Sequence, residues 1–186
     1  MNKIKTILLI CICLASVSCL KEKREATYNS QESKIDQYIS KNMYVTTTEG
    51  GKTETDTLRV VYNEGTSRLV TQEGVGEELK PNGTVSFYYA GYIFTGSKSL
   101  FATNHQQTAT GERWELTDAQ YDICTLNLKN SDIIEGLRHG LVGVKTGEIC
   151  QILFSGKYAY GKRPLGIVPA NSALLFEIWV EGVSNE

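Results

Sequence analysis

Histidine, proline and long hydrophobic runs are scarce in this sequence of 186 residues. Its two histidines, His105 and His139, do not stand at metal-ligand spacing from a cysteine or from each other, so the sequence predicts no metal site and no cofactor. No apolar stretch reaches the ~20 residues that a membrane-spanning helix needs. Basic residues (19) are outnumbered by acidic ones (21), which is not the balance of a nucleic-acid-binding protein.

Motifs for nucleophilic catalysis and phosphate binding are also missing. Ser155 has no catalytic-triad context, and the glycines at Gly74 and Gly76 lack the lysine of a phosphate-binding loop. Tyrosine (10 residues) and glycine (17) are frequent, whereas proline (3) is rare, a composition that favours strands joined by turns. With 41% hydrophobic and 22% charged residues, the chain has the composition of an ordinary folded domain.

Residues 1–18 have the organisation of a signal peptide. Two lysines near the N-terminus precede a short apolar stretch, Ile7–Leu14, and small residues then lead to Cys19. This pattern resembles a bacterial lipoprotein signal, although Ser16 stands where such signals usually place leucine. We expect Cys19 to be the lipidated first residue of a protein anchored in the bacterial cell envelope, at the periplasmic face or the cell surface. The alternatives are an ordinary signal peptide and a cytoplasmic start.

Two cysteines remain beyond the expected lipidation site. Cys124 and Cys150 would lie in an oxidising compartment, where a disulfide between them could form. Cysteines in strands are also common as separate buried hydrophobic residues. The sequence leaves both interpretations open, and it contains no indication of the oligomeric state.

The chain after the signal peptide divides into three parts. Residues 19–33 are polar and charged, without aliphatic periodicity, and predict a flexible tether. Residues 34–67 predict an N-terminal extension with a helix and strands. Ile35, Tyr38 and Ile39 would form the buried face of that helix, and strands are expected near Thr57–Tyr62 and Arg68–Thr71. Residues 68–183 form the main domain.

The main domain combines strands with one short helix. Strands are predicted at Thr84–Phe94, Ile123–Leu128, Glu148–Phe154 and Ala173–Val180, the last with strict alternation of apolar and polar residues. Ser131 and Asp132, followed by Glu135, predict a helix that begins with a capping box. Residues 103–121 are polar and read as an excursion from the sheet. This pattern indicates an α+β domain with antiparallel strands.

Four segments of this domain stand out in order along the chain. They are Val85–Tyr92 (VSFYYAGY), Ile133–Glu148 (IIEGL, then GL and VKTGE), Tyr158–Gly161 (YAYG) and Gly166–Glu177 (GIVPANSALLFE). Together they resemble the FKBP family of peptidyl-prolyl cis-trans isomerases. The resemblance implies an antiparallel sheet wrapped around one short helix, here with an N-terminal helix and extra strands. It also implies proline-containing polypeptides as partners and folding of exported proteins as the role.

The resemblance further implies an aromatic cup that grips a proline ring. Its catalytic residues would be Tyr89, Phe101, Ile134, Tyr160 and Phe176, and its substrate-binding residues would be Ile133, Leu137, Ile167, Val168 and Cys124. The Ile134 backbone N–H and the Tyr160 hydroxyl would donate to substrate carbonyls. The alternative interpretation is that these residues form a closed core, and it is strongest for Phe176 and Ile134, since strand and helix faces bury such residues anyway.

Two positions depart from the family pattern. Ala102 replaces the aspartate that usually follows the phenylalanine at Phe101, and Cys124 stands at an aromatic wall position. Trp114 or Tyr121, in the long segment after Phe101, could cover the cup or replace that wall. We therefore expect isomerase activity that is weak or lost. The alternatives are an inert binding or chaperone-like lipoprotein, and a relative in fold only whose surface carries another role.

Overall fold

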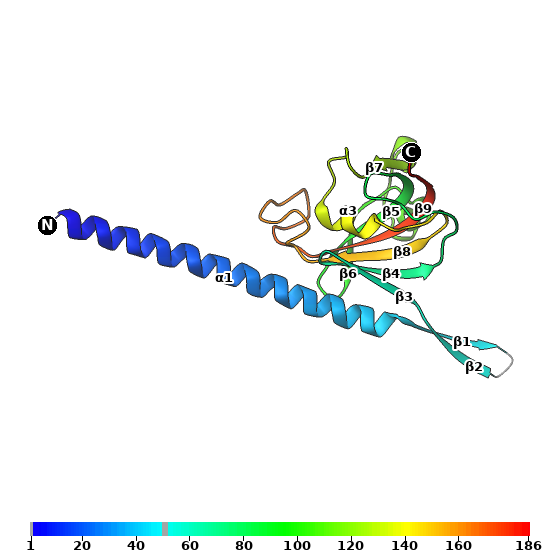
Figure 1. Cartoon of the computed structure of the whole chain (residues 1–186), viewed down its shortest axis with the longest axis horizontal. Coiled ribbons are helices and arrows are strands. Elements are labelled where there is room, and N and C mark those ends of the chain that lie inside the picture. The colour runs from blue at the N-terminus through cyan, green and yellow to red at the C-terminus, as the bar shows by residue number, and fades with distance from the viewer. Residues whose placement is uncertain (1, 50–51) are drawn as a thin grey trace.

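The computed structural model of the chain describes residues 2–49 and 52–186, and it places a long helix beside a β-sheet domain (Figure 1). Helix α1 (Asn2–Asn42) runs along one side of the domain and extends beyond it toward the N-terminus. A hairpin of β1 (Tyr44–Glu49) and β2 (Lys52–Thr57) follows and projects away from the main sheet. Within the described ranges, no helix is both long and apolar enough to cross a membrane.

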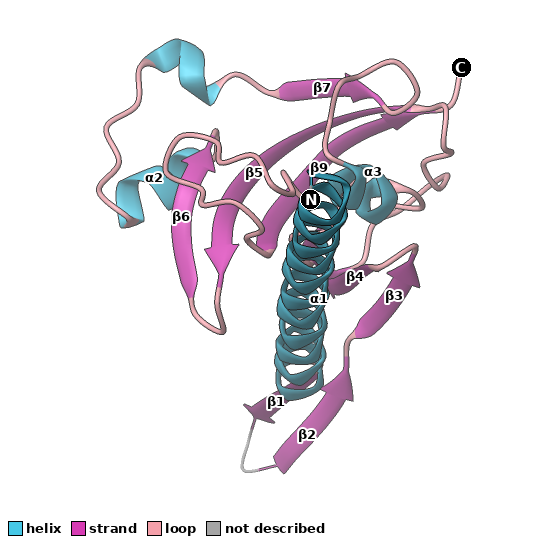
Figure 2. Ribbon diagram, turned by 90° about the vertical axis from the view of Figure 1, so that its left-hand side faces the viewer, coloured by secondary structure: helices cyan, strands magenta, loops and turns pink. Residues whose placement is uncertain are grey.

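The main sheet has seven antiparallel strands. Six of them follow the spatial order β3-β4-β8-β9-β5-β6, and β7 pairs with the first part of β5. They are β3 (Arg59–Asn63), β4 (Thr66–Gln72), β5 (Thr84–Phe94), β6 (Lys98–Thr103), β7 (Cys124–Asn127), β8 (Ile149–Phe154) and β9 (Leu174–Ser184). Figure 2 shows β6 and β3 at opposite edges of this sheet. The predicted α+β class and antiparallel sheet are confirmed.

Three short helices lie outside the strands. Helix α2 (Gln106–Gly111) and the 3-10 helix η1 (Asp118–Tyr121) fall in the polar segment between β6 and β7. Helix α3 (Glu135–Leu141) packs on the sheet and buries Leu137 and Leu141. The structure thus contains the expected short helix against the sheet, and the polar segment after β6 has helical turns rather than being irregular throughout.

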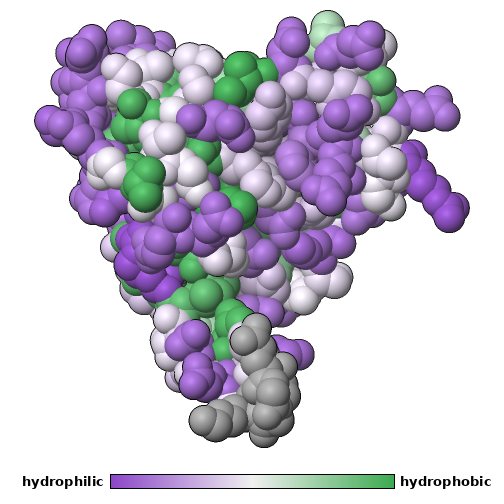
Figure 3. Space-filling model, turned by 90° about the vertical axis from the view of Figure 1, so that its right-hand side faces the viewer, coloured by the Kyte–Doolittle hydropathy of each residue, from purple (hydrophilic) through white to green (hydrophobic). Residues whose placement is uncertain are grey.

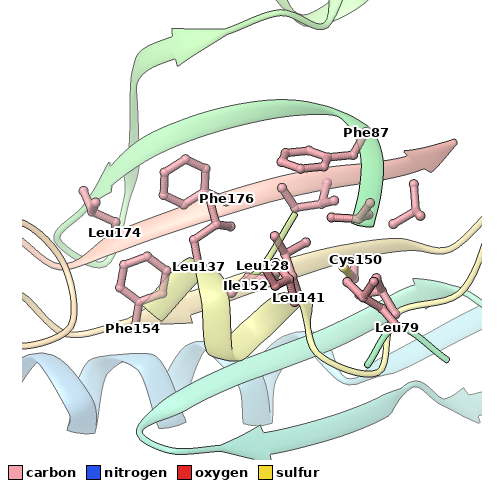
Figure 4. Packing of buried hydrophobic residues seen from close by; sticks show 14 of the residues in the cluster. Leu79, Phe87, Leu128, Leu137, Leu141, Cys150, Ile152, Phe154, Leu174 and Phe176 are labelled. Atoms are coloured by element: carbon pink, nitrogen blue, oxygen red, sulfur yellow. The ribbon is translucent and has the colours of Figure 1, made fainter. Parts of the chain in front are cut away.

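Hydrophobic clusters cover both faces of the sheet. The cluster under α3 includes Ile152, Phe154 and Phe176, and Figure 4 shows these side chains close to Leu137. The cluster under α1 contains residues that alternate with them along the strands, such as Leu153 and Leu175. Successive residues of a strand point to opposite faces, so a sheet covered by a helix on each face is apolar on both.

Helix α1 confirms one prediction and corrects another. Ile35 and Ile39 are buried and Tyr38 packs against the same cluster, as the i, i+3, i+4 spacing predicted. The prediction of a flexible tether over residues 19–33 was wrong, because this segment continues α1. It lacks an aliphatic face, but it is rich in Lys, Glu, Arg, Gln and Ala, which favour helix. Tyr28, which is 5% exposed, packs it against the domain.

The predicted capping box at the start of α3 is also wrong. The helix begins at Glu135 after Ile134, and no side chain caps it. Instead, the N–H of Gly136 donates to the carbonyl of Tyr158 at 2.9 Å. A loop distant in sequence therefore satisfies one of the free amides that every helix start exposes. This bond joins α3 to the loop that contains Tyr160.

Strand β5 has the predicted bounds, whereas β3 starts two residues later than expected and the β1–β2 hairpin was not predicted. Cys124 and Cys150 are both free thiols, so the structure contains no disulfide between them.

The molecular face in Figure 3 is mostly hydrophilic, and its hydrophobic residues are interspersed among polar ones. That face therefore presents no large apolar patch of the kind that marks a protein interface.

Candidate active site

A cavity of about 290 Å³ opens between α3, β7 and the concave side of β5, β6 and β9. We call it the aromatic cavity. Its walls are predominantly hydrophobic, and tyrosine hydroxyls, a thiol and one carboxylate supply the polar side-chain groups. The residues that line it are Phe87, Tyr89, Phe101, Ala102, Cys124, Leu126, Asp132, Ile133, Ile134, Leu137, Tyr160 and Phe176.

Three aromatic rings shape one side of the aromatic cavity. The Phe101 ring meets the Phe176 ring edge-on, with 5.8 Å between centroids and 87° between planes, and Tyr89 lies 6.3 Å from Phe176. Edge-to-face contacts of this kind are favourable and fix the orientation of the rings. Gly91 makes the arrangement possible, because a Cβ at this position would lie 2.9 Å from both phenylalanine rings. The glycine in β5 is therefore a requirement of the cavity wall.

The floor of the aromatic cavity is formed by α3 and the core beneath it. Leu137 is 8% exposed and lies close to Phe176 and Phe154 (Figure 4). Phe154 stacks under Phe176 at 6.0 Å and 15°. A Cβ at Gly136 would come within 2.3 Å of the Phe154 ring, so only glycine allows α3 to approach β8 this closely. The floor thus rests on closely packed side chains that hold its shape.

Three polar side chains of the aromatic cavity are neutral hydrogen-bond donors. Burial raises the pKa of the Tyr160 hydroxyl, and it raises the pKa of Tyr89 and of the Cys124 thiol in the same way. All three therefore keep their protons at neutral pH. Among the described residues, neither the Tyr160 hydroxyl nor the Ile134 amide has a hydrogen-bond partner. Both remain available to a ligand that carries carbonyl groups.

Eight of the ten predicted site residues line the aromatic cavity together. The two that do not are Ile167 and Val168. Residues Leu165 and Val168 form a tight bridge, with N–H to carbonyl distances of 3.0 and 2.9 Å. This turn directs Val168 into the core at 2% exposure and leaves Ile167 at 65% exposure. Neither side chain lines the aromatic cavity, and their expected role in substrate binding stays a prediction.

The sequence interpretation missed Phe87 and Leu126 as lining residues. A signal for both was present, because Phe87 stands two residues from Tyr89 in one strand, and Leu126 two residues from Cys124 in another. Alternation along a strand places such pairs on one face. Asp132 also lines the cavity, although its sequence context suggested only a role in starting the helix.

The segment after Phe101 contributes no aromatic ring to the aromatic cavity. Trp114 packs against the cluster under α1, and Tyr121 lines a different hollow with Tyr88 and Trp179. The idea that either ring covers the aromatic cavity was therefore wrong. In the described part of the chain, no three His, Cys, Asp or Glu side chains come together in a way that could hold a metal ion.

Comparison with known proteins assigns this fold and cavity to a family. The model of the FKBP-type peptidyl-prolyl cis-trans isomerase family matches residues 76–181, which is more than half of the chain. The chain belongs to this family. Ala102 and Cys124 both lie in the wall of the aromatic cavity.

Individual FKBP relatives agree with this assignment. FK506-binding protein 1A of Neurospora crassa is 32% identical over 122 residues, which cover 64% of this chain and 89% of that protein. A protein of Equus caballus named inactive peptidyl-prolyl cis-trans isomerase FKBP6 is 28% identical over 124 residues, or 65% of this chain; the match spans only 34% of that protein. A solved peptidyl-prolyl cis-trans isomerase from Pseudomonas syringae pv. tomato has a TM-score of 0.58 at 18% identity, covering 87% of this chain and 96% of the other. At that identity the likeness concerns the fold alone.

Proposed function

We propose that this protein is a prolyl isomerase of weak activity that acts on exported proteins at a membrane surface. The observation that supports the proposal most directly is the aromatic cavity itself, which combines apolar walls with two free hydrogen-bond donors, the Tyr160 hydroxyl and the Ile134 amide. A cavity of this composition suits a proline ring flanked by carbonyl groups.

The chemistry of prolyl isomerisation requires no nucleophile and no metal. Rotation about an amide bond crosses a barrier of ~18–20 kcal/mol because twisting removes the resonance of the C–N bond. The twisted amide has a less polar carbonyl than the planar one, so an apolar site binds it better than water does. Rings that hold the proline while few polar groups contact its carbonyls are sufficient to lower the barrier.

The residues of the aromatic cavity can share this work. Phe101 and Phe176 would flank the proline ring, and Leu137 would support it from below. The backbone N–H of Ile134 would donate to one substrate carbonyl and the Tyr160 hydroxyl to another. Both residues are half-buried, and a hydrogen bond gains strength where part of the surrounding water is excluded.

A second candidate is an inert binding or chaperone-like protein that uses the same cavity. Ala102 removes a carboxylate from the wall and Cys124 removes a ring, so a twisted amide would be held by fewer contacts. The similar protein of Equus caballus is named an inactive isomerase, which is consistent with this candidate. In this candidate the cavity would bind proline segments without accelerating their isomerisation.

Location at a membrane rests on the sequence around Cys19, whose side chain lies outside the described part of the structure. Among the side chains of α1 that the structure describes, Tyr28 is the first buried one, nine residues after Cys19, which corresponds to ~14 Å of helix at ~1.5 Å per residue. A lipid on Cys19 would therefore hold the domain close to the bilayer. Labelled palmitate that enters the wild type and not Cys19→Ala would support this, and equal labelling of both would refute it.

A protease-free isomerisation assay tests the proposed activity. The full chain in mild detergent would be compared with Tyr160→Phe and Phe176→Ala on a proline-limited peptide, with folding checked by circular dichroism. We expect weak acceleration by the wild type and a loss of about twofold to tenfold in kcat/KM for Tyr160→Phe, as for one hydrogen bond. A folded wild type without acceleration that still binds proline peptides would favour the second candidate.

A further inference from the structure

One side chain of α1 joins the two ends of the loop that carries Tyr160. The Nε2 of Gln31 donates to the carbonyl of Asn171 at 2.7 Å, and its Oε1 accepts from the N–H of Gly156 at 2.9 Å. Both ends of the side-chain amide are therefore used. Figure 1 shows this loop, drawn in orange between β8 and β9, next to α1.

The loop from residue 156 to residue 171 is closed tightly at this point. A Cβ at Gly156 would lie 2.3 Å from the carbonyl oxygen of Asn171, so the two backbones touch. Asn171 itself has φ +58°, a left-handed conformation that asparagine tolerates better than most residues. Gly161 accepts from the N–H of Asn171 and donates to the carbonyl of Gly156. The residue next to Tyr160 is thus bonded to both ends that Gln31 joins.

Further contacts fix α1 against the loop. The Tyr28 hydroxyl donates to Oδ1 of Asn171 at 2.7 Å, and the Ser155 hydroxyl donates to Glu32 at 3.1 Å. One turn and two turns further on, Ile35 and Ile39 are buried in the sheet. The helix therefore has little freedom to move relative to the sheet, and the loop is held between the helix and α3, where Gly136 bonds Tyr158.

We propose that Gln31, assisted by Tyr28, is a positioning residue for the Tyr160 hydroxyl. This inference rests on the proposed function, since it concerns how the aromatic cavity presents one of its two free donors. Neither residue lines the aromatic cavity, and both would act only through the geometry of the loop. The N-terminal helix is therefore a component of the site rather than only a spacer.

A double-mutant cycle between Gln31 and Tyr160 tests the inference. Gln31→Met removes both hydrogen bonds and keeps the volume of the side chain. In the full chain we expect it to lower kcat/KM, or the affinity for a proline peptide if the wild type is an inert binder, about threefold to tenfold. In a Tyr160→Phe background, Gln31→Met should lower the same kcat/KM or affinity less than twofold, because the hydroxyl that Gln31 positions is already absent.

The matched control is Gln37→Met on the same helix. The Gln37 side chain is exposed and bonds only Ser33 of its own helix, at 3.4 Å, so this variant should leave kcat/KM and affinity unchanged. Tyr28→Phe is a milder change. It should lower kcat/KM or the affinity for a proline peptide when Tyr160 is present, and lower it less in the Tyr160→Phe background, so the test stands even if Gln31→Met folds poorly.

The outcomes separate this inference from the proposed function. An active or proline-binding wild type in which Gln31→Met costs equally in both Tyr160 backgrounds, or costs nothing, would overturn the inference alone. A folded wild type that neither catalyses nor binds proline peptides would overturn the proposed function and the inference with it. Tyr160-dependent losses for Gln31→Met and Tyr28→Phe would support the inference.

Discussion

Ala102 and Cys124 set how much contact the aromatic cavity can make with a twisted amide. Both residues line it, and both have small side chains. Cys124 is half-buried and its thiol is kept neutral by burial, which raises its pKa. A neutral thiol adds little polarity to the wall and leaves one side without a ring.

Cys124→Phe should therefore strengthen the site. An added ring that contacts a ligand and the neighbouring Tyr89 contributes about 0.5–1.5 kcal/mol beyond its area, which corresponds to a gain of about twofold to tenfold in kcat/KM or in affinity for a proline peptide. Cys124→Ser, which removes the thiol without adding a ring, should give no gain. A folded Cys124→Phe protein with unchanged or reduced binding would contradict this account of the wall.

Most of the cavity residues could be predicted from sequence, and the exceptions have a physical reason. Positions in strands and at α3 were predictable because regular structure fixes the direction of each side chain. Ile167 and Val168 lie in a tight turn, where neighbouring side chains point in different directions, so that one is buried and the next is exposed. Sequence spacing does not predict these directions in a turn. Tyr160 also lies in a loop, and the sequence did not connect α1, which bonds both ends of that loop, to the site.

At the scale of elements, strands β3 and β4 hold α3 in place. Asn63 donates to the carbonyl of His139, Thr66 donates to that of Gly136, and Arg68 donates to those of Gly140 and Val142 at 2.7 Å each. These bonds satisfy carbonyl groups that the end of a short helix would otherwise leave free. Strands β3 and β4 therefore support the floor of the aromatic cavity, although none of their residues lines it.

Glu148 stabilises this arrangement and should be costly to remove. Its carboxylate is fully buried, 3.3 Å from Nε of Arg68 and 3.2 Å from Nη2 of Arg59. Glu148→Ala would leave the buried Arg68 charge without its partner, and we expect a loss of about 3–5 kcal/mol in the free energy of unfolding. Urea denaturation measures this loss. Glu73→Ala, which removes the exposed partner of Arg59, should cost less than ~1 kcal/mol; equal losses would refute the role of Glu148.

The contacts between α1 and the loop also explain why residues 19–33 were predicted as a tether. Sequence periodicity detects helices that bury an aliphatic stripe, and this part of α1 contacts the domain through polar side chains such as Gln31 and through Tyr28. Hydrogen bonds to a distant loop leave no periodic signal. The helix was therefore predictable where it packs Ile35 and Ile39, and was missed where it contacts the loop.

At the scale of the whole molecule, the two faces of the sheet differ in chemistry. One face carries α3 and the aromatic cavity. On the other, beyond the cluster under α1, the His105 ring stacks on Trp179 with 3.8 Å between centroids, and Nδ1 of His105 lies 2.9 Å from the Thr108 hydroxyl. Burial lowers the pKa of His105, and the opposing influence of Glu177 is smaller. The folded protein thus favours the neutral ring.

Global stability should accordingly fall as the pH falls through the ordinary histidine range, near ~6.5. A histidine whose pKa is lowered by folding binds protons more readily in the unfolded chain, so acid favours unfolding and its stabilising contribution is present above that range. Urea denaturation should give a lower free energy of unfolding at pH 5.5 than at pH 7.5. The His105→Gln variant should show a smaller difference between these two free energies. An unchanged difference in that variant would show that His105 is not responsible.

The central claim, that the aromatic cavity recognises proline segments, is tested most directly by mapping where a proline peptide binds. Amide chemical shifts of the labelled chain would be recorded during titration with a proline peptide and with its alanine counterpart. The account predicts that the proline peptide shifts Ile134, Leu137 and residues around Tyr160, and that the alanine peptide does not. Shifts confined to the opposite face of the sheet, or equal responses to both peptides, would contradict it.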